Sequence, residues 1–237
     1  MLLSGGLVED LMRLAMISPA VLSGIFKQME VSGPRLSPPL ILRLDGVGFG
    51  RALSDAGFSQ PRDRRVHDAL TSAAEALMKR FSGAASYVVS DEISVLLDSG
   101  APYGGRLFKV VSVAASLVSS IISKRLGHEL LMDCRPILIP STSMWGAYVL
   151  WRSRVAANNF ISKLYHGQKG RAETPSFMTM LEHVKERLLG KDVWEVLGSC
   201  LTYEIVEETR INPVTGELVK KRRRVLSRFD GPWRCLR

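Results

Sequence analysis

Cysteine is scarce in this sequence, and the positions of the cysteines argue against the usual sites built from them. The 237 residues contain only Cys134, Cys200 and Cys235, with no CxxC pair. Such spacing argues against a disulfide framework and against a zinc site. We therefore expect unpaired thiols in a reducing, cytoplasmic compartment.

Features of membrane proteins and histidine clusters are also missing. No apolar run approaches the ~20 residues that a helix needs to cross a bilayer. The opening stretch MLLSGGLVEDLM lacks the basic start of a signal peptide. The four histidines, at positions 67, 128, 166 and 183, show no ligand spacing. We expect no membrane partner and no histidine general base.

Positive charge, in contrast, is abundant. The formal net charge is +9 at pH 7, which suits a polyanionic partner such as a nucleic acid. A basic surface without such a partner is the alternative. Because 46% of the residues are hydrophobic, the chain can bury one sizeable core with a smaller appended lobe.

Apolar periodicity and turn residues predict an α+β fold of the ferredoxin-like type, in which an antiparallel sheet has both helices on one face. The predicted order is β-α-β-β-α-β, with strands at 40–44, 85–89, 93–97 and 132–139 and helices at 63–81 and 109–126. Between Asp45 and Pro61 we expect a loop.

Further segments flank this core. Helical spacing over 7–30, interrupted at Pro19, predicts an N-terminal extension. Beyond the core we expect helices at 148–164 and 176–189 and a hairpin of strands 202–208 and 218–226. The predicted domains are an extension at 1–33, a core at 34–145, and C-terminal helices with a basic hairpin packed on the core at 146–237.

The most informative stretch is RLDGVGFGR at 43–51. An apolar strand ends here on Asp45, which Gly46, Gly48 and Gly50 follow closely. A carboxylate at a strand end can face a ligand, and glycines let backbone amides approach a phosphate. The alternative is a plain strand and turn in which Asp45 caps the turn.

A second acidic group lies in the short connection Ser90-Asp91-Glu92 between two strands. In the predicted fold the first strand lies beside the third, so Asp45 and Asp91 meet, with Glu92 alongside as a third acid. Paired carboxylates suit hard divalent cations, and two magnesium ions there can support phosphoryl transfer. A merely polar hairpin tip is the alternative.

These motifs stand in an order that resembles a known family. RLDGVGFGR is followed by QPRD at 60–63, SDEISVLL at 90–97, MDCRPILIPS at 132–141, and WR and NN between 151 and 159. Over residues 40–165 this order is similar to the tRNA-His guanylyltransferases, most closely to their archaeal and bacterial tRNA-guanylyltransferase-like branch. The resemblance implies a polymerase-type palm domain that adds nucleotides in the 3′–5′ direction to the 5′ end of tRNA. It also implies magnesium, GTP or ATP as substrate, and a tetramer.

The resemblance also implies roles for individual residues. Asp45, the Gly46 carbonyl and Asp91 would hold magnesium, and Asp45, Asp91 and Glu92 would be the catalytic acids. Nucleotide binding is implied for two loops and for a basic pair at a helix start, namely Asp45, Gly46, Val47, Gly48, Phe49, Gly50, Ser90, Asp91, Arg106 and Lys109. For the basic pair, a solvated helix end is the alternative.

Three residues depart from the eukaryotic pattern. Gly50, Gln60 and Ala156 stand where those members have histidine, lysine and histidine. These changes weaken the expectation of a strict role on tRNA-His. They favour the guanylyltransferase-like branch, which repairs truncated tRNA 5′ ends with the opposite strand as template.

A tRNA needs a wide cationic face, because phosphate contacts dominate affinity. The predicted RNA-binding residues are Arg135, Arg152, Asn158, Asn159 and Lys163, with Arg154, Lys169, Arg171 and the run Lys220–Arg224 as further basic candidates. The run lies on a predicted strand, so only alternate members can face one RNA. A charged strand edge that blocks aggregation is the alternative.

Two other functions are compatible with the same features. A palm-type nucleotide cyclase would use both acids but would need no basic RNA face. A non-catalytic RNA-binding module would keep the acids for structure only. Failure to bind tRNA favours the cyclase, and an Asp91→Asn variant that behaves like the wild type favours the binding module.

Overall fold

The computed structural model describes residues 12, 15–16, 18–29, 33–167, 175–211, 213–214 and 216–236. The chain divides into two compact units, Met1–Pro34 and Arg35–Arg237. In the first unit, helix α2 spans Pro19–Met29 and therefore begins at the proline that was predicted to interrupt the helical pattern. Most of the helix predicted before Pro19 lies outside the described residues.

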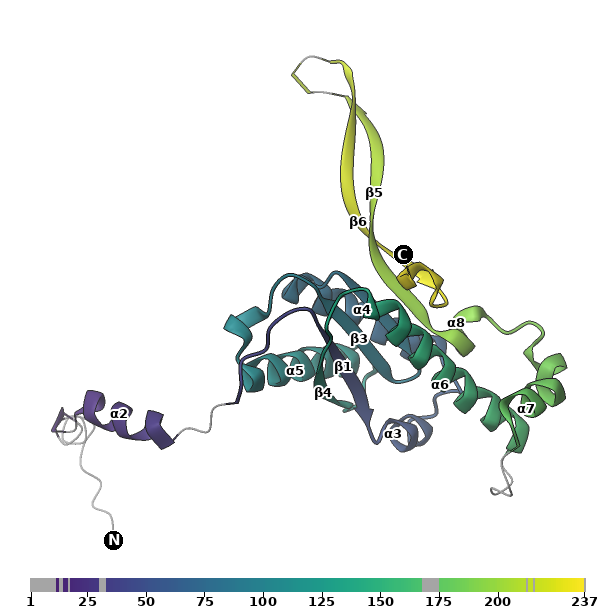
Figure 1. The fold of residues 1–237 in the computed structure, drawn as a ribbon, viewed down its shortest axis with the longest axis horizontal. Helices are drawn as coiled ribbons and strands as arrows, with labels where there is room; N and C mark the ends of the chain where they lie inside the picture. Colours follow the sequence, from purple (N-terminus) through teal and green to yellow (C-terminus); the bar gives the residue numbers. More distant parts are fainter. Residues whose placement is uncertain are drawn as a thin grey trace, which may run out of the picture. The chain divides into compact units, whose positions relative to one another are not determined.

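The second unit is built on a six-stranded antiparallel sheet with the order β4-β1-β3-β2-β5-β6 (Figure 1). The strands are β1 (Leu40–Val47), β2 (Ala85–Val89), β3 (Glu92–Leu97), β4 (Leu131–Leu138), β5 (Ser199–Ile211) and β6 (Leu218–Asp230). Because β1 pairs with both β3 and β4, the strand that carries Asp45 lies inside the sheet. The predicted α+β fold is confirmed.

Helices cover both faces of this sheet. Helices α4 (Arg64–Phe81) and α5 (Leu107–Leu126) pack on one face, and α6 (Met144–His166) packs on the other (Figure 1). Side chains alternate along a strand, so Leu42 and Leu44 face α4 and α5 whereas Ile41 faces α6. The shorter elements are α3 (Phe49–Asp55), η1 (Pro102–Gly105), α7 (Phe177–Val184), η2 (Lys185–Leu188), α8 (Val193–Leu197) and η3 (Trp233–Leu236).

Helix α5 is long and apolar enough to cross a membrane by length and composition alone. The expectation that no segment qualifies was therefore wrong for this helix. Val110, Ala114, Val118 and Ile122 of α5 are fully buried in the core that the helix shares with α4 and the sheet. Core helices pass the same test, so this property is only a weak indication of a membrane.

The glycine-rich stretch after β1 is not the plain loop that was predicted, because α3 begins inside it at Phe49. Gly48 precedes this helix with φ at 68°, a conformation that favours glycine. At Gly46 the reason is space, since a Cβ there would lie 2.4 Å from the Phe49 ring. The glycines thus allow the chain to turn back and bury Phe49, which is 2% exposed.

Only the base of the β5–β6 hairpin belongs to the sheet. β2 pairs with the first four residues of β5, Ser199 to Thr202, and the rest of β5 pairs with β6 alone. This outer part, which we call the arm, stands clear of the sheet in Figure 1. Exposed apolar residues gather at its end, namely Ile211, Val214 and Leu218.

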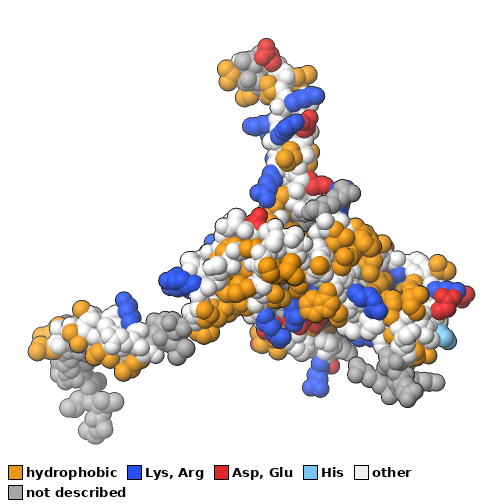
Figure 2. Space-filling model, viewed as in Figure 1, with side chains coloured by type: hydrophobic (Ala, Val, Ile, Leu, Met, Phe, Trp, Pro, Cys, Tyr) orange, Lys and Arg blue, Asp and Glu red, His pale blue; other side chains and the backbone are white. Residues whose placement is uncertain are grey.

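The basic run on β6 divides between the two faces of the arm, as predicted for a strand. Figure 2 shows Lys and Arg side chains along its length. The run is partly neutralised, because Arg222 lies 2.9 Å from Glu207 and Arg223 lies 3.4 Å from Glu208. Arg224 stacks over the Tyr203 ring at 3.8 Å. The arm therefore presents less free positive charge than its sequence suggests.

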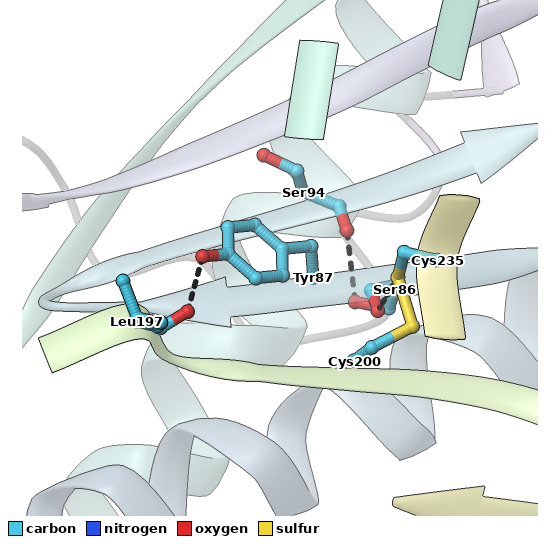
Figure 3. Close-up of a disulfide and its surroundings, with 6 residues drawn as sticks. All are labelled: Ser86, Tyr87, Ser94, Leu197, Cys200 and Cys235. Carbon is cyan, nitrogen blue, oxygen red and sulfur yellow. Dashed lines mark hydrogen bonds between the residues drawn. A yellow bond between two sulfur atoms is a disulfide. The ribbon is translucent and has the colours of Figure 1, made fainter. Parts of the chain in front are cut away.

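A disulfide joins Cys200, at the base of β5, to Cys235 in η3 (Figure 3). The expectation of unpaired cysteines was therefore wrong, and only Cys134 is free. The pairing follows from the fold, because Gly231 N donates to Gly198 O at 2.7 Å and so returns the chain end to the start of β5. The cytoplasmic location stays a prediction.

Candidate active site at the end of the sheet

Asp45 and Asp91 come together at one end of the sheet. Asp45 lies opposite Glu92, the first residue of β3, and Asp91 lies in the two-residue turn just before it. Gly46 N donates to the Asp91 carbonyl oxygen at 3.2 Å. A cleft there is lined by Asp45, Ser90, Asp91 and Asn159 of α6, among others. The structure thus brings the end of β1 and the β2–β3 turn into one site.

The two carboxylates carry negative charge that is only partly compensated. The pKa of Asp45 is raised, first by burial and then by the charge of Asp91. Arg43 opposes this shift from 3.5 Å. Two acids that repel one another at the mouth of a cleft favour a bound cation.

The β2–β3 turn holds strain. Ser90 adopts φ of 59°, a left-handed conformation that costs a residue other than glycine on the order of 1 kcal/mol. Glycine would remove this strain, yet the sequence keeps serine. Ser90 and Asp91 both line two clefts, one on each side of the turn, so this turn is the wall that the two clefts share.

Glu92 has a different role from the third catalytic acid that was predicted. Its side chain is almost fully buried, and Arg152 donates to both of its oxygens, Nε to Oε1 at 2.9 Å and Nη2 to Oε2 at 2.6 Å. Arg43 Nε lies 3.7 Å from Oε2. Burial raises the pKa of Glu92, and Arg152 opposes that shift. Neither Glu92 nor Arg152 is free here, so the predicted contact of Arg152 with RNA is also not supported.

Within the described part of the chain, no group of three or more His, Cys, Asp or Glu side chains is arranged to hold a metal ion. Two carboxylates, Asp45 and Asp91, remain, and the Gly46 carbonyl, which follows Asp45 in the chain, stays the predicted third oxygen. Magnesium is usually held by one or two carboxylates together with water and substrate phosphates. The oxygen donors and the raised pKa of Asp45 therefore fit magnesium bound together with a nucleotide.

Sequence reasoning missed Asp133 on β4. It lies directly opposite Asp45 in the β1–β4 pair and contributes to the raised pKa of Asp45. Its Oδ2 accepts from Arg135 at 2.6 Å, and its buried Oδ1 has no partner among the described residues. The exposed Arg135, predicted to bind RNA, thus pairs with an acid beside the site. An aspartate inside a predicted strand gave no signal of this proximity.

A second cleft adjoins the acids across the Ser90–Asp91 turn. Its walls come from α3, the segment before α4, the first turn of α4, the Ser90–Asp91 turn and α6. They include Gly50, Gln60, Arg62, Val66, His67 and Lys163. Asp63 of the same segment caps α4 by accepting from Arg65 N at 2.9 Å. The QPRD motif thus places Arg62 in the cleft and fixes the first turn of α4.

The basic pair predicted for nucleotide binding, Arg106 and Lys109, lies elsewhere. The backbone of Arg106 forms an isolated antiparallel β-bridge with Arg35, which precedes β1. The ammonium group of Lys109 stacks over the Tyr103 ring. This is the end of the sheet where β1 begins. Asp45 lies five residues further along β1, on the order of 16 Å at 3.3 Å per residue. The structure does not bring this pair to the acids within one chain.

The remaining predicted positions are distributed as follows. Val47 is exposed at the end of β1, Phe49 is buried, and Gly50 lines the second cleft. Asn158 lines neither cleft, whereas Asn159 lines the first. Arg154 stacks over Phe177. Lys169 and Arg171 lie outside the described residues.

His67 forms a buried polar chain behind the second cleft. Its Nε2 lies 2.9 Å from Ser199 Oγ, which donates to Asp230 Oδ1 at 3.0 Å. The ring stacks on Trp194 with centroids 4.7 Å apart. Burial, helped by the charge of Arg228, lowers the pKa of His67 to about 3. The imidazole is therefore neutral in the folded protein at neutral pH.

We expect this histidine to weaken the fold in acid. Between pH 6.5 and 3 the unfolded chain binds a proton at His67 that the folded chain does not, so stability is lost as the pH falls through this window. Relative to His67→Gln, the wild type should lose roughly 1.4 kcal/mol more per pH unit. Urea unfolding at pH 4, 5, 6 and 7 measures both slopes, and parallel slopes would contradict the assignment.

The chain is similar to known proteins in both sequence and fold. The model of the tRNAHis guanylyltransferase family matches residues 25–140. The Arabidopsis thaliana tRNA(His) guanylyltransferase 2 is 29% identical over 124 residues. That alignment covers 48% of this chain and 23% of the plant protein, so the chain corresponds to only about a quarter of it.

Solved structures share the fold. A bacterial tRNA(His) guanylyltransferase-like protein in complex with ATP has a TM-score of 0.66 at 20% identity, over 79% of this chain and 87% of that one. The GTP complex of a bacterial protein of this kind gives 0.66 at 19% identity, over 86% and 90%. The Saccharomyces cerevisiae tRNA(His) guanylyltransferase gives 0.65 at 17%, over 76% and 92%. Residues 25–140 thus match the tRNAHis guanylyltransferase family model, and the fold is that of the solved guanylyltransferase-like structures.

Proposed function

We propose that this protein is a magnesium-dependent nucleotidyltransferase that adds nucleotides in the 3′–5′ direction to tRNA 5′ ends. The observation that carries the proposal is that Asp45 and Asp91 line one cleft together, with Gly46 N bonded to the Asp91 carbonyl and Asp91 also lining the adjoining second cleft. The match of residues 25–140 to the family model and the ATP- and GTP-bound structures of similar fold support it. Template-dependent repair of truncated ends is the form of the activity that the sequence departures favour.

The proposed reaction has two transfers. An oxygen of the RNA 5′-monophosphate attacks the α-phosphorus of a nucleoside triphosphate, and pyrophosphate leaves. The 3′-hydroxyl of an incoming nucleotide then attacks the activated 5′ phosphorus, and a nucleoside monophosphate leaves. Magnesium, when bound, would supply the charge that stabilises the phosphoryl oxygens. Both transfers need two phosphate-bearing ligands in one site, which matches the two adjoining clefts.

In the proposed reaction, different residues bind the cation and position the β2–β3 turn. Asp45, Asp91 and the Gly46 carbonyl would hold the cation. Arg152 of α6 donates two hydrogen bonds to Glu92 at the start of β3. This contact would hold the adjoining β2–β3 turn, with its strained Ser90, in a fixed position beside the ligands. A rigid turn matters because misplacement of reacting groups by about 1 Å can cost a hundredfold in rate.

The RNA would lie along exposed cations outside these clefts. Arg135, next to Asp133 on β4, is exposed close to the acids. Lys220, Arg222 and Arg224 share one face of the arm, which gives a second contact region for a large polyanion. Tetramer assembly, with which the exposed apolar residues of α2 are compatible, stays a prediction.

Incorporation of labelled GTP into a tRNA that lacks its 5′ nucleotide tests this function. With magnesium, the wild type should extend the RNA by the nucleotide that the opposite strand specifies. Asp45→Ala should not extend it. A cyclic nucleotide product without extension would replace the proposal by the cyclase. Tight tRNA binding with neither product would leave a binding module.

A further inference from the structure

Two cations, Arg62 and Lys163, line the second cleft without forming an ion pair within the described part of the chain. Arg62 lies just before α4 and is mostly buried. Its Nη1 donates to the Pro61 carbonyl at 2.9 Å, and its buried Nε has no partner among the described residues. Lys163 lies at the rim, on α6. In the described part of the chain neither side chain forms an ion pair with Asp or Glu, in contrast to Arg152, Arg43 and Arg135 around the acids.

The two charges are close enough to influence one another. The pKa of Lys163 is lowered by burial and then by Arg62, and the charge of Asp91 opposes this shift. The pKa of Arg62 is lowered by burial, and Asp91 is the only charge that opposes this shift. Keeping the largely buried Arg62 without an ion pair, beside a second positive charge, costs free energy. An anion bound between them would recover it.

We propose that Arg62 and Lys163 bind the phosphate chain of a nucleoside triphosphate in the second cleft, next to the Asp45–Asp91 pair. This inference rests on the proposed function and assigns its phosphate contact to residues other than Arg106 and Lys109. It also moves Lys163 from the predicted RNA-binding face to the nucleotide.

The rest of the cleft favours a nucleotide over an RNA backbone as the source of the phosphates. Its other walls include apolar side chains, namely Leu53, Pro61 and Val66, and the neutral His67. Ser90 and Asp91 close the side that faces the acids. Ser59, Gln60 and Asp63 add polar groups to these walls. A cleft that combines two cations with apolar walls and a few polar groups matches a ligand with a charged chain and a flat base. An RNA backbone would instead follow an open cationic groove.

Binding of GTP, GMP and guanosine, each measured by displacement of a fluorescent GTP analogue from the full chain in magnesium without RNA, tests the inference. We expect the wild type to bind GTP more tightly than guanosine. Arg62→Gln and Lys163→Gln should each weaken the affinity for GTP by roughly tenfold or more and leave the affinity for guanosine unchanged. Arg62→Lys should retain most of the preference, because it keeps the charge.

Arg80→Gln is the matched control. It removes the same charge in the last turn of α4, about 24 Å from Arg64 at the start of that helix at 1.5 Å per residue. It should not change the affinity for GTP. Thermal melts of every variant verify the fold. If the wild type binds no nucleotide, the proposed function itself fails.

Two other outcomes overturn only the assignment of the cations. In one, the wild type prefers GTP to guanosine and both Gln variants keep that preference. In the other, the variants keep the wild-type affinity for GTP but lose affinity for a short RNA with a 5′-monophosphate. That result would assign Arg62 and Lys163 to binding the RNA 5′ end.

Discussion

Asp91→Asn should reduce nucleotide addition to tRNA by about a hundred- to a thousandfold, while the fold is retained. Removal of one group that stabilises transition-state charge has an effect of this size. Asparagine keeps the shape of the side chain but removes half of the paired negative charge that would hold magnesium. Single-turnover addition of labelled GTP at saturating magnesium measures the rate.

Stability separates this loss from unfolding. The charge of Asp91 raises the pKa of Asp45, so its removal relieves a repulsion, and the metal-free variant should melt at the same temperature as the wild type or above it. Asp55→Asn, at the exposed end of α3, is the matched control and should keep full activity. A rate within threefold of the wild type for Asp91→Asn would favour the non-catalytic binding module.

The largest effect on folding is expected for Arg152→Gln. It removes the two shortest hydrogen bonds of Glu92, which is only 3% exposed. The carboxylate then keeps only Ser94 Oγ at 3.2 Å and Arg43 Nε at 3.7 Å. Breaking one partner of a buried ion pair costs about 3–5 kcal/mol. Urea unfolding at pH 7 should show a loss of this order, and a loss below 1 kcal/mol would contradict the buried pair.

A double mutant isolates the pair itself. Glu92→Gln with Arg152→Gln removes both charges at similar volume, so it should recover much of the stability that Arg152→Gln loses. The interaction energy from this cycle is specific to the contact between β3 and α6. Arg80→Gln, in the exposed last turn of α4, should have an effect of only a few tenths of a kcal/mol.

The order of the core elements could be predicted because each has a strong local pattern. Strands such as 85–89 are apolar throughout and end in turn residues, and the helix at 63–81 repeats apolar residues at helical spacing. Topology then placed Asp45 beside Asp91, since the first and third strands of this fold are neighbours. Helix α3 was not predicted because the glycines around Phe49 are typical of a loop. The short helix forms where Phe49 is buried in the core.

The details that depend on partners far apart in the sequence were not predictable. In the sequence Glu92 has no evident partner, because Arg152, which forms its ion pair, lies 60 residues later. Cys200 and Cys235 carry no motif, and only the return of the chain end pairs them. Arg62 and Lys163 meet only in the folded cleft. Arg106 and Lys109 matched a motif, but the direction of α5 places them at the other end of the sheet.

The disulfide at the base of the arm has a practical consequence for a chain that is cut. Cys200 precedes the arm and Cys235 follows it, so a protease that cleaves between Ile211 and Leu218 produces two pieces that remain covalently linked. Such nicked protein should migrate as the intact chain in denaturing electrophoresis without a reductant and as two fragments with it. A purified sample judged intact on a non-reducing gel can therefore already have lost the continuity of its arm.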